Sequence, residues 1–264
     1  MFEEKLVQEE KQLNDVPWTI RQTIIGTVLT LLPWLLFAIG ASLMHDRVAQ
    51  TAPLPPGEDI LNAITILIFS TLIEGAFLIA PFYYALRPYR AHPPGRRFQL
   101  ALRTLGFTGF SARQVSSLII VCFLTIFVLN IAYAQLITAF DLNVQTNDQF
   151  ILNLSKSAPF TTYATLLVAV LVAPFCEEIF FRGFVFPGLL KASSVVTAIF
   201  GCAILFALAH GDSGSFPVLF GIGIALSFLR WRTCSIWPSI ILHMLNNGLS
   251  ALLIILVMLG IMRV

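Results

Sequence analysis

Residues 163–190 read YATLLVAVLVAPFCEEIFFRGFVFPGLL, an apolar run that contains three charged side chains, Glu177, Glu178 and Arg182. Apolar runs longer than about 18 residues are typical of helices that cross a bilayer. A charge at that depth is costly unless it faces a partner or a polar cavity. The stretch therefore predicts a membrane-spanning helix whose charged residues face the interior of a helical bundle.

The whole chain has the composition of a membrane protein. Of its 264 residues, 57% are hydrophobic and only 11% are charged, whereas a soluble domain has roughly 25% charged residues. This composition excludes a soluble α/β enzyme and a disordered chain, and a net charge of +2 gives no indication of nucleic-acid binding. We expect an all-α polytopic protein whose first partner is the lipid bilayer.

Apolar runs along the chain predict about seven transmembrane helices around an intramembrane polar cavity. Only eight charged residues follow Phe160, and three of them are the cluster in the quoted stretch. That concentration of charge within an apolar region indicates a functional site. The expected spans are residues 23–44, 60–86, 115–138, a span that starts near 160, and then 194–209, 217–229 and 238–262.

Six arginines with no acidic residue among them lie between residues 87 and 114, and they predict a cytoplasmic loop. The amino terminus would then be cytoplasmic, and residues 45–59 and 139–159 would face outward. The predicted units are a cytoplasmic amphiphilic segment (1–22), three helices with their loops (23–159) and a helical core (160–264). The arginines are Arg87, Arg90, Arg96, Arg97, Arg103 and Arg113.

The two adjacent glutamates are predicted to have different roles. Glu178 and Arg182 are four residues apart, so on a helix they share a face and can form an ion pair. Glu177 lies about 100° around the helix from Glu178 and faces elsewhere. Glu178 is thus predicted to be structural, whereas Glu177 is a candidate general base.

Two polar pairs at helical spacing follow in later spans. Phe206 and His210 are four residues apart, as are His243 and Asn247. Glu177 and His210 lie about equally far from a turn near residues 191–194, so two helical arms would bring them to a similar depth.

His243 lies only a short way into the last span. To reach the depth of Glu177, that span would need a tilt or a break, which Pro217, Gly221, Pro238 and Gly248 could permit.

The series EExxxR, FxxxH and HxxxN, in this order across successive apolar helices, resembles the CPBP family of intramembrane proteases. This family includes the type II CAAX prenyl endopeptidases and the bacteriocin-processing and self-immunity proteins. The resemblance covers residues 174–248 and does not extend to the first three spans. In this chain the motifs are Glu177, Glu178 and Arg182, then Phe206 and His210, then His243 and Asn247.

The resemblance implies an intramembrane endopeptidase. Glu177 and His210 would activate a water molecule, His243 and Asn247 would donate hydrogen bonds to the developing oxyanion, and Glu178 and Arg182 would support the site. The implied partner is a peptide or membrane-protein substrate, which includes prenylated CAAX tails and bacteriocin or leader peptides. The implied location is a bacterial inner membrane.

Alternatives with the same residues stay open. Glu177, His210 and His243 could supply three zinc ligands with one open position. The HExxH pattern of zincins is absent, so we favour a mechanism with no metal cofactor. A non-catalytic immunity or scaffold protein would bind a partner through the same cavity.

Glu74 in the second span is a further intramembrane carboxylate. It belongs to no motif, and we expect it to pair inside the bundle.

Overall fold

The computed structural model describes residues 13, 15–48, 53–142 and 144–262. Within these ranges the chain is helical and contains no strand. The helices, in chain order, are α2 (Ile20–Val48), α3 (Pro56–Ala76), α4 (Ile79–Leu86), the 3₁₀ turn η1 (Arg87–Tyr89), α5 (Pro94–Thr104), α6 (Ala112–Ala139), α7 (Asn147–Ser157), α8 (Pro159–Leu167), the π-helical turn η2 (Val168–Val172), α9 (Ala173–Phe180), the π-helical turn η3 (Phe181–Val185), α10 (Phe186–Leu190), α11 (Val195–Ala209), α12 (Phe216–Thr233) and α13 (Trp237–Met258).

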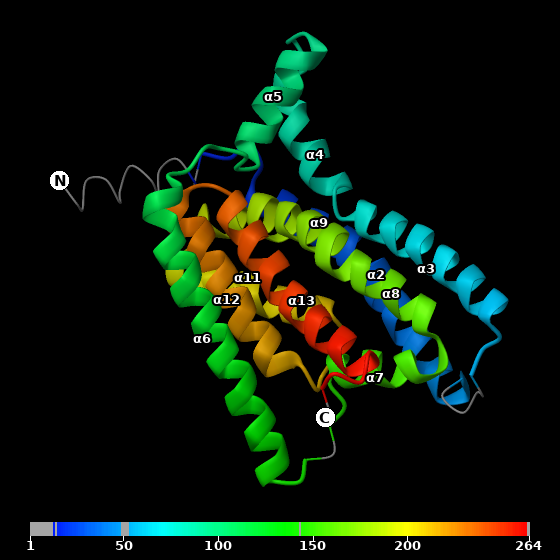
Figure 1. The fold of residues 1–264 in the computed structure, drawn as a ribbon. Coiled ribbons are helices and arrows are strands. Elements are labelled where there is room, and N and C mark those ends of the chain that lie inside the picture. The colour runs from blue at the N-terminus through cyan, green and yellow to red at the C-terminus, as the bar shows by residue number, and fades with distance from the viewer. Residues whose placement is uncertain (1–12, 14, 49–52, 143, 263–264) are drawn as a thin grey trace.

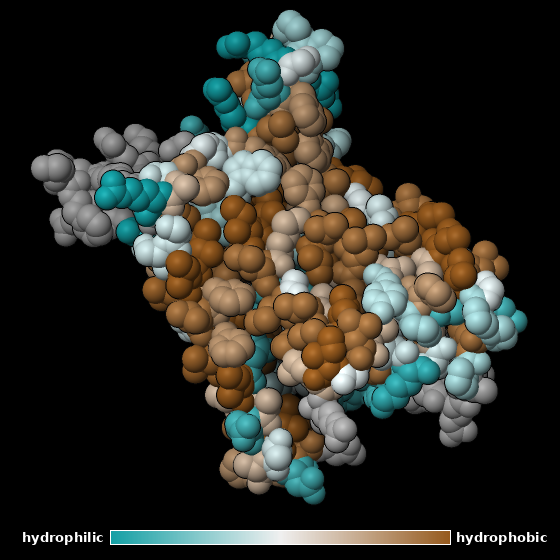
Figure 2. Space-filling model, viewed as in Figure 1, coloured by the Kyte–Doolittle hydropathy of each residue, from teal (hydrophilic) through white to brown (hydrophobic). Residues whose placement is uncertain are grey.

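The surface of the bundle is apolar, as lipid contact requires. Large side chains such as Leu29, Leu72 and Val128 are more than half exposed. Figure 2 shows apolar side chains over the middle of the molecule and hydrophilic ones gathered near its two ends. The predicted class of all-α polytopic membrane protein is confirmed, but the predicted count of seven spans is not. Among the described residues, four stretches are long and apolar enough to cross a membrane, Pro56–Tyr89, Val115–Ala139, Pro159–Leu190 and Trp237–Met258.

The helical run from α8 to α10 forms the centre of the bundle and is the most buried of the four stretches. In Figure 1 it lies between α3 on one side and α11, α12 and α13 on the other. The side chains of Phe180, Phe181, Phe184 and Phe186 are fully buried within it. The stretch quoted at the outset is therefore the core of the fold.

Two π-helical turns divide this central run, and each precedes a proline. The amide of Ala173 donates to the carbonyl of Val168, and the amide of Phe186 donates to the carbonyl of Phe181, both five residues back. Proline has no amide hydrogen, and its ring collides with the preceding turn of a regular helix. A widened turn before Pro174 and before Pro187 removes that collision and rotates the residues that follow.

Helix α3 runs parallel to the central run and is joined to it at both ends. The carboxylate of Asp59 accepts hydrogen bonds from the amide of Phe160 (2.8 Å), the amide of Thr161 (3.0 Å) and the hydroxyl of Thr161 (2.7 Å). At the other end, the ring of Phe77 packs edge-on against that of Phe180, with centroids 5.2 Å apart. These contacts fix the register of α3 against α8 and α9.

The start of α13 is anchored by the loop between α5 and α6. The amide of Ile236 donates to the carbonyl of Gly106 (2.8 Å), and the hydroxyl of Ser235 donates to the carbonyl of Thr108 (2.7 Å). Pro238 lies in the first turn of α13, which then continues without interruption past Gly248. Of the tilt or break that we expected in this span, the break is absent.

The structure adds detail to three predicted segments. The second predicted span lies within the apolar stretch Pro56–Tyr89, which contains α3 and then α4. Helix α5 projects beyond the bundle (Figure 1). The basic loop contains α5, and the predicted outward loop 139–159 contains α7, which begins at a capping box of Thr146 and Gln149. Most of segment 1–22 lies outside the described residues.

The Asp59 contacts make a prediction for stability. Asp59→Leu leaves the amides of Phe160 and Thr161 without their acceptor at the start of α8, so it should destabilise the protein by about 2–4 kcal/mol. Thermal unfolding of the purified protein in detergent measures the effect. An unchanged Tm would show that these bonds do not hold α3 against α8.

Candidate active site

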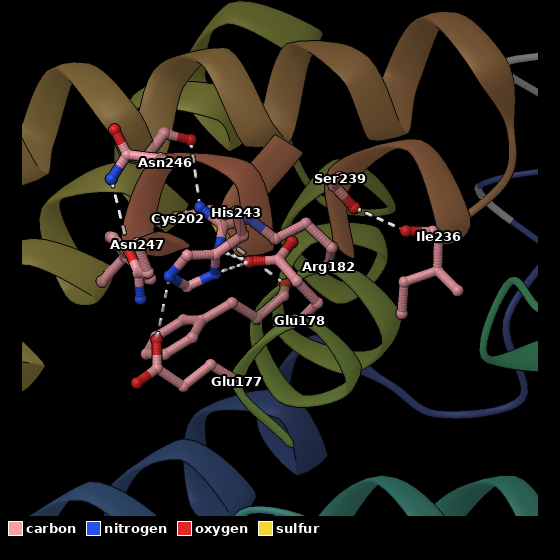
Figure 3. A network of polar contacts seen from close by, with 12 residues as sticks. Glu177, Glu178, Arg182, Cys202, Ile236, Ser239, His243, Asn246 and Asn247 are labelled. Carbon is pink, nitrogen blue, oxygen red and sulfur yellow. Dashed lines mark hydrogen bonds and ion pairs between the residues drawn. The ribbon is translucent and has the colours of Figure 1, made fainter. Parts of the chain in front are cut away.

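A buried ion pair lies at the centre of the polar residues. The side chains of Glu178 and Arg182 are both 0% exposed, and Arg182 Nη1 donates to Glu178 Oε1 at 2.7 Å. The predicted pair is therefore present. His243 Nδ1 of α13 lies 3.0 Å from the same glutamate oxygen, and Figure 3 shows the three side chains turned towards one another. One carboxylate oxygen thus joins α9, η3 and α13.

Arg182 is held by further contacts to α11 and α12. Its Nη2 donates to the carbonyl of Gly223 at 3.2 Å, and its guanidinium carbon lies 4.5 Å from the ring centroid of Phe206. Gly223 also lets α12 pack closely against α11, because a β-carbon there would collide with the backbone of Ala203. A carboxylate, a carbonyl and an aromatic face therefore contact the guanidinium and offset part of the cost of its burial, although its Nε is buried without a hydrogen-bond partner in the described structure.

Glu177 faces two histidines and not the ion pair. Its Oε2 lies 4.0 Å from His210 Nε2 and 4.0 Å from His243 Nε2. The three residues come from α9, from the end of α11 and from α13, so the predicted meeting of Glu177 and His210 at one depth is observed. In Figure 3, Glu177 and Glu178 approach the His243 ring from different directions.

The hydrogen bond of each histidine Nδ1 shows which ring nitrogen carries the proton. His210 Nδ1 lies 2.8 Å from the carbonyl oxygen of Phe206, and a carbonyl only accepts, so Nδ1 carries the proton. The same argument applies to His243 Nδ1 beside the ionised Glu178. Both Nε2 atoms therefore point at Glu177, and in a neutral ring each presents a lone pair.

The ring of Phe206 packs against three polar side chains, those of His210, His243 and Arg182. Its ring centroid lies 4.7 Å from that of His210 and 5.6 Å from that of His243, and it also covers Arg182. The sequence showed only its helical spacing from His210. The structure adds that Phe206 orients both histidine rings and shields the buried ion pair from water.

The side-chain amide of Asn247 is already engaged. Its Nδ2 donates to the carbonyl of Ala169 in η2 at 2.8 Å, and its Oδ1 accepts from Asn246 at 3.2 Å. The widened turn η2 leaves carbonyls without their usual helical partners, so a side chain from α13 can bond there. Asn247 thus ties α13 to the central run one turn beyond His243.

Glu74 does not form the pair that we expected. Its side chain is buried at 8% exposure, and its Oε2 has no hydrogen-bond partner in the described structure. It lies close enough to Glu177 for the two carboxyl groups to repel each other when both are ionised. Its place beside the site depends on the register of α3 and could not be read from a motif.

The three converging residues are spaced more widely than the ligands of a bound zinc ion. Zinc bonds of roughly 2.0–2.1 Å in a tetrahedron place two ligand atoms about 3.4 Å apart, which is less than the 4.0 Å found on both sides of Glu177. Across the described ranges, no group of three His, Cys, Asp or Glu side chains is placed to hold a metal ion.

Residues 159–249 match the family model described as type II CAAX prenyl endopeptidase Rce1-like. This Rce1-like segment is therefore similar to that family over about a third of the chain. The match begins at the start of α8 and ends in α13, so the Rce1-like segment contains all the converging residues named above. No solved structure matches the chain.

Two curated proteins resemble parts of this chain. The putative membrane peptidase YdiL of Bacillus subtilis is 29% identical over 101 residues, which are 38% of this chain and 40% of that protein. The membrane-embedded CAAX protease MroQ of Staphylococcus aureus is 36% identical over 84 residues, which are 30% of this chain and 34% of that protein. The similarity therefore spans less than half of each of these relatives.

The ion pair makes a prediction about folding. Glu178→Ala leaves a buried guanidinium without its carboxylate and should destabilise the Rce1-like segment by about 3–5 kcal/mol. Folded yield and Tm in detergent measure this loss. A double variant, Glu178→Leu with Arg182→Leu, removes both charges and should recover part of it. Wild-type Tm for Glu178→Ala would contradict a structural role for the pair.

Proposed function

We propose that this protein is an intramembrane endopeptidase that hydrolyses a peptide bond by direct attack of water. The observation that carries the proposal is the convergence of His210 Nε2 and His243 Nε2 on one oxygen of Glu177, each at 4.0 Å. A water about 2.8 Å from two atoms so spaced would bond to both at an angle of about 90°. Glu177 and His210 are the residues that we assign to water activation.

The reaction needs only these groups to move its protons. As the water oxygen attacks the peptide carbonyl, one water proton passes to Glu177, and His210 Nε2 accepts the other hydrogen as a hydrogen bond. When the tetrahedral intermediate collapses, the C–N bond breaks and the leaving amine takes the proton from Glu177. Glu177 is thereby returned to its ionised form without a covalent enzyme intermediate.

His243 and Asn247 are assigned to the oxyanion. Because His243 Nδ1 is bonded to Glu178, its Nε2 is the ring nitrogen that can donate a hydrogen bond to the oxyanion when the ring carries both protons. Asn247 Nδ2 has a second hydrogen besides the one bonded to Ala169. Donors of this kind lower the barrier by roughly 3–4 kcal/mol each in other proteases.

The proposed substrate is a peptide or a membrane protein cleaved in or beside the bilayer. The family description and the name of MroQ both refer to CAAX proteins, which supports a substrate of that class, with a prenylated tail as its most specific form. The amino terminus is proposed to be cytoplasmic, because the arginine-rich α4–α5 region favours that side. The competing proposal is an immunity or scaffold protein that binds a partner without cleaving it.

Replacement of Glu177 separates these two proposals. Glu177→Gln removes the base but keeps the size and shape of the side chain, so it should abolish proteolysis and leave Tm nearly unchanged. Comparative membrane proteomics of wild-type and Glu177→Gln cells should show a peptide product that disappears in the variant. Full activity of Glu177→Gln on a confirmed substrate would rule out the assigned base.

Metal removal tests the mechanism separately. Since the assigned steps use only side chains, purified protein should contain less than one zinc per chain and should keep its activity after exhaustive chelation. The measurements are metal analysis and turnover before and after chelation. Stoichiometric zinc, with activity lost on its removal and restored on its return, would establish the zinc alternative.

A further inference from the structure

The register of α3 places Glu74 opposite Glu177. At the start of the two helices, Asp59 bonds to Thr161, which lies 102 residues further along the chain. At their end, Phe77 packs on Phe180, 103 residues further along. The extra residue is that of the π-helical turn η2 between these two contacts. Glu74 is one turn before Phe77, and the same separation of 103 leads from Glu74 to Glu177.

The surroundings of Glu74 agree with this placement. Its carboxyl interacts electrostatically with Glu177 and with the Cys176 thiol, the two residues that the register predicts. It is 8% exposed, and its Oε2 is buried without a hydrogen-bond partner. Of the two buried arginines among the described residues, Arg182 is bonded to Glu178, and Arg230 donates to the carbonyl of Arg182. Glu74 therefore faces the candidate active site without any neutralising partner in the described structure.

Glu177 itself is poorly held. In the described part of the chain its carboxyl group makes only the two 4.0 Å contacts to histidines, and its Oε2 has no hydrogen bond. A base must be fixed within a few tenths of an ångström to act efficiently, because displacement by about 1 Å can cost about 10²-fold in rate. Neither α11 nor α13 provides a donor to Glu177 when the histidines are neutral.

Two facing carboxyl groups without a cation are compatible when one of them keeps its proton and donates it in a hydrogen bond to the other. We propose that Glu74 is a positioning residue, whose carboxyl group donates a hydrogen bond, directly or through one water, to Glu177 and directs that carboxylate towards His210 and His243. This inference rests on the proposed function of Glu177 and adds a residue from outside the Rce1-like segment.

Asp59 provides a matched control on the same helix. Both acids are buried on the side of α3 that faces the central run, but Asp59 is bonded to two amides and a hydroxyl, whereas Glu74 is not. Removal of a satisfied buried acid costs stability, whereas replacement of an unpaired one by an apolar side chain is neutral or stabilising. The two positions therefore separate a structural acid from a functional one.

The experiment measures kcat, KM and Tm for purified variants in detergent, on a peptide identified as a product-yielding substrate in the proteomic comparison. Glu74→Leu should lower kcat by about 10²-fold, with KM within about twofold of wild type and Tm unchanged or raised by about 2–4 °C. Glu74→Gln keeps a neutral donor and should retain kcat within about threefold. Asp59→Leu should lower Tm and keep the turnover per folded molecule.

The outcomes are distinguishable. Wild-type kcat for Glu74→Leu, or a lowered Tm with normal turnover per folded molecule, would overturn the positioning role. An equal loss of kcat in Glu74→Gln and Glu74→Leu would also overturn it, because a neutral hydrogen-bond donor at this position would then not be enough to position Glu177. Glu74→Met, which fills a similar volume, is measured in parallel in case the leucine variant does not fold. Glu177→Gln is the reference, because full activity there would refute the proposed function and not Glu74 alone.

Discussion

The arrangement of the bundle depends on the carboxylate of Glu178. A single charge in the interior of a membrane protein is costly, and one oxygen of this carboxylate is paired with Arg182 four residues later and with His243 from the last helix. Arg182 in turn bonds to a carbonyl of α12 and lies against the ring of Phe206 in α11. One buried charge therefore draws the central run, α11, α12 and α13 to a common point.

This network leaves the neighbouring glutamate available for chemistry. Because Glu178 takes the arginine and the inner nitrogen of His243, Glu177 on the adjacent face meets only the outer nitrogens of two histidines. The same contrast recurs on α3, where Asp59 is bonded and Glu74 is not. In both pairs one acid joins helices through an ion pair or hydrogen bonds, and the other acid has neither, at a cost to stability that the proposed function explains.

Local spacing predicted much of the site. The ion pair follows from the separation of Glu178 and Arg182 on a helix, and the depth of His210 follows from counting residues outward from the turn near 191–194. The approach of His243 could not be predicted in this way, because it depends on the anchoring of α13 by Gly106 and Thr108 across the molecule. The position of Glu74 depends on helix register and on a widened turn.

Some helices were also missed for physical reasons. Helix α7 is short and polar, so it gives no apolar run, although its capping box at Thr146 and Gln149 is a recognisable start signal. Helix α5 begins at Pro94 in the basic loop, and its arginines likewise leave no apolar run.

The most direct test of the central claim is an experimental structure with a phosphinic analogue of a confirmed cleavage site. Its two oxygens imitate those of the tetrahedral intermediate. The account predicts one oxygen within hydrogen-bond distance of Glu177 and His210, and the other within that distance of His243 Nε2 and Asn247 Nδ2. A metal ion bound between Glu177, His210 and His243, or an analogue bound away from Glu177, would contradict it.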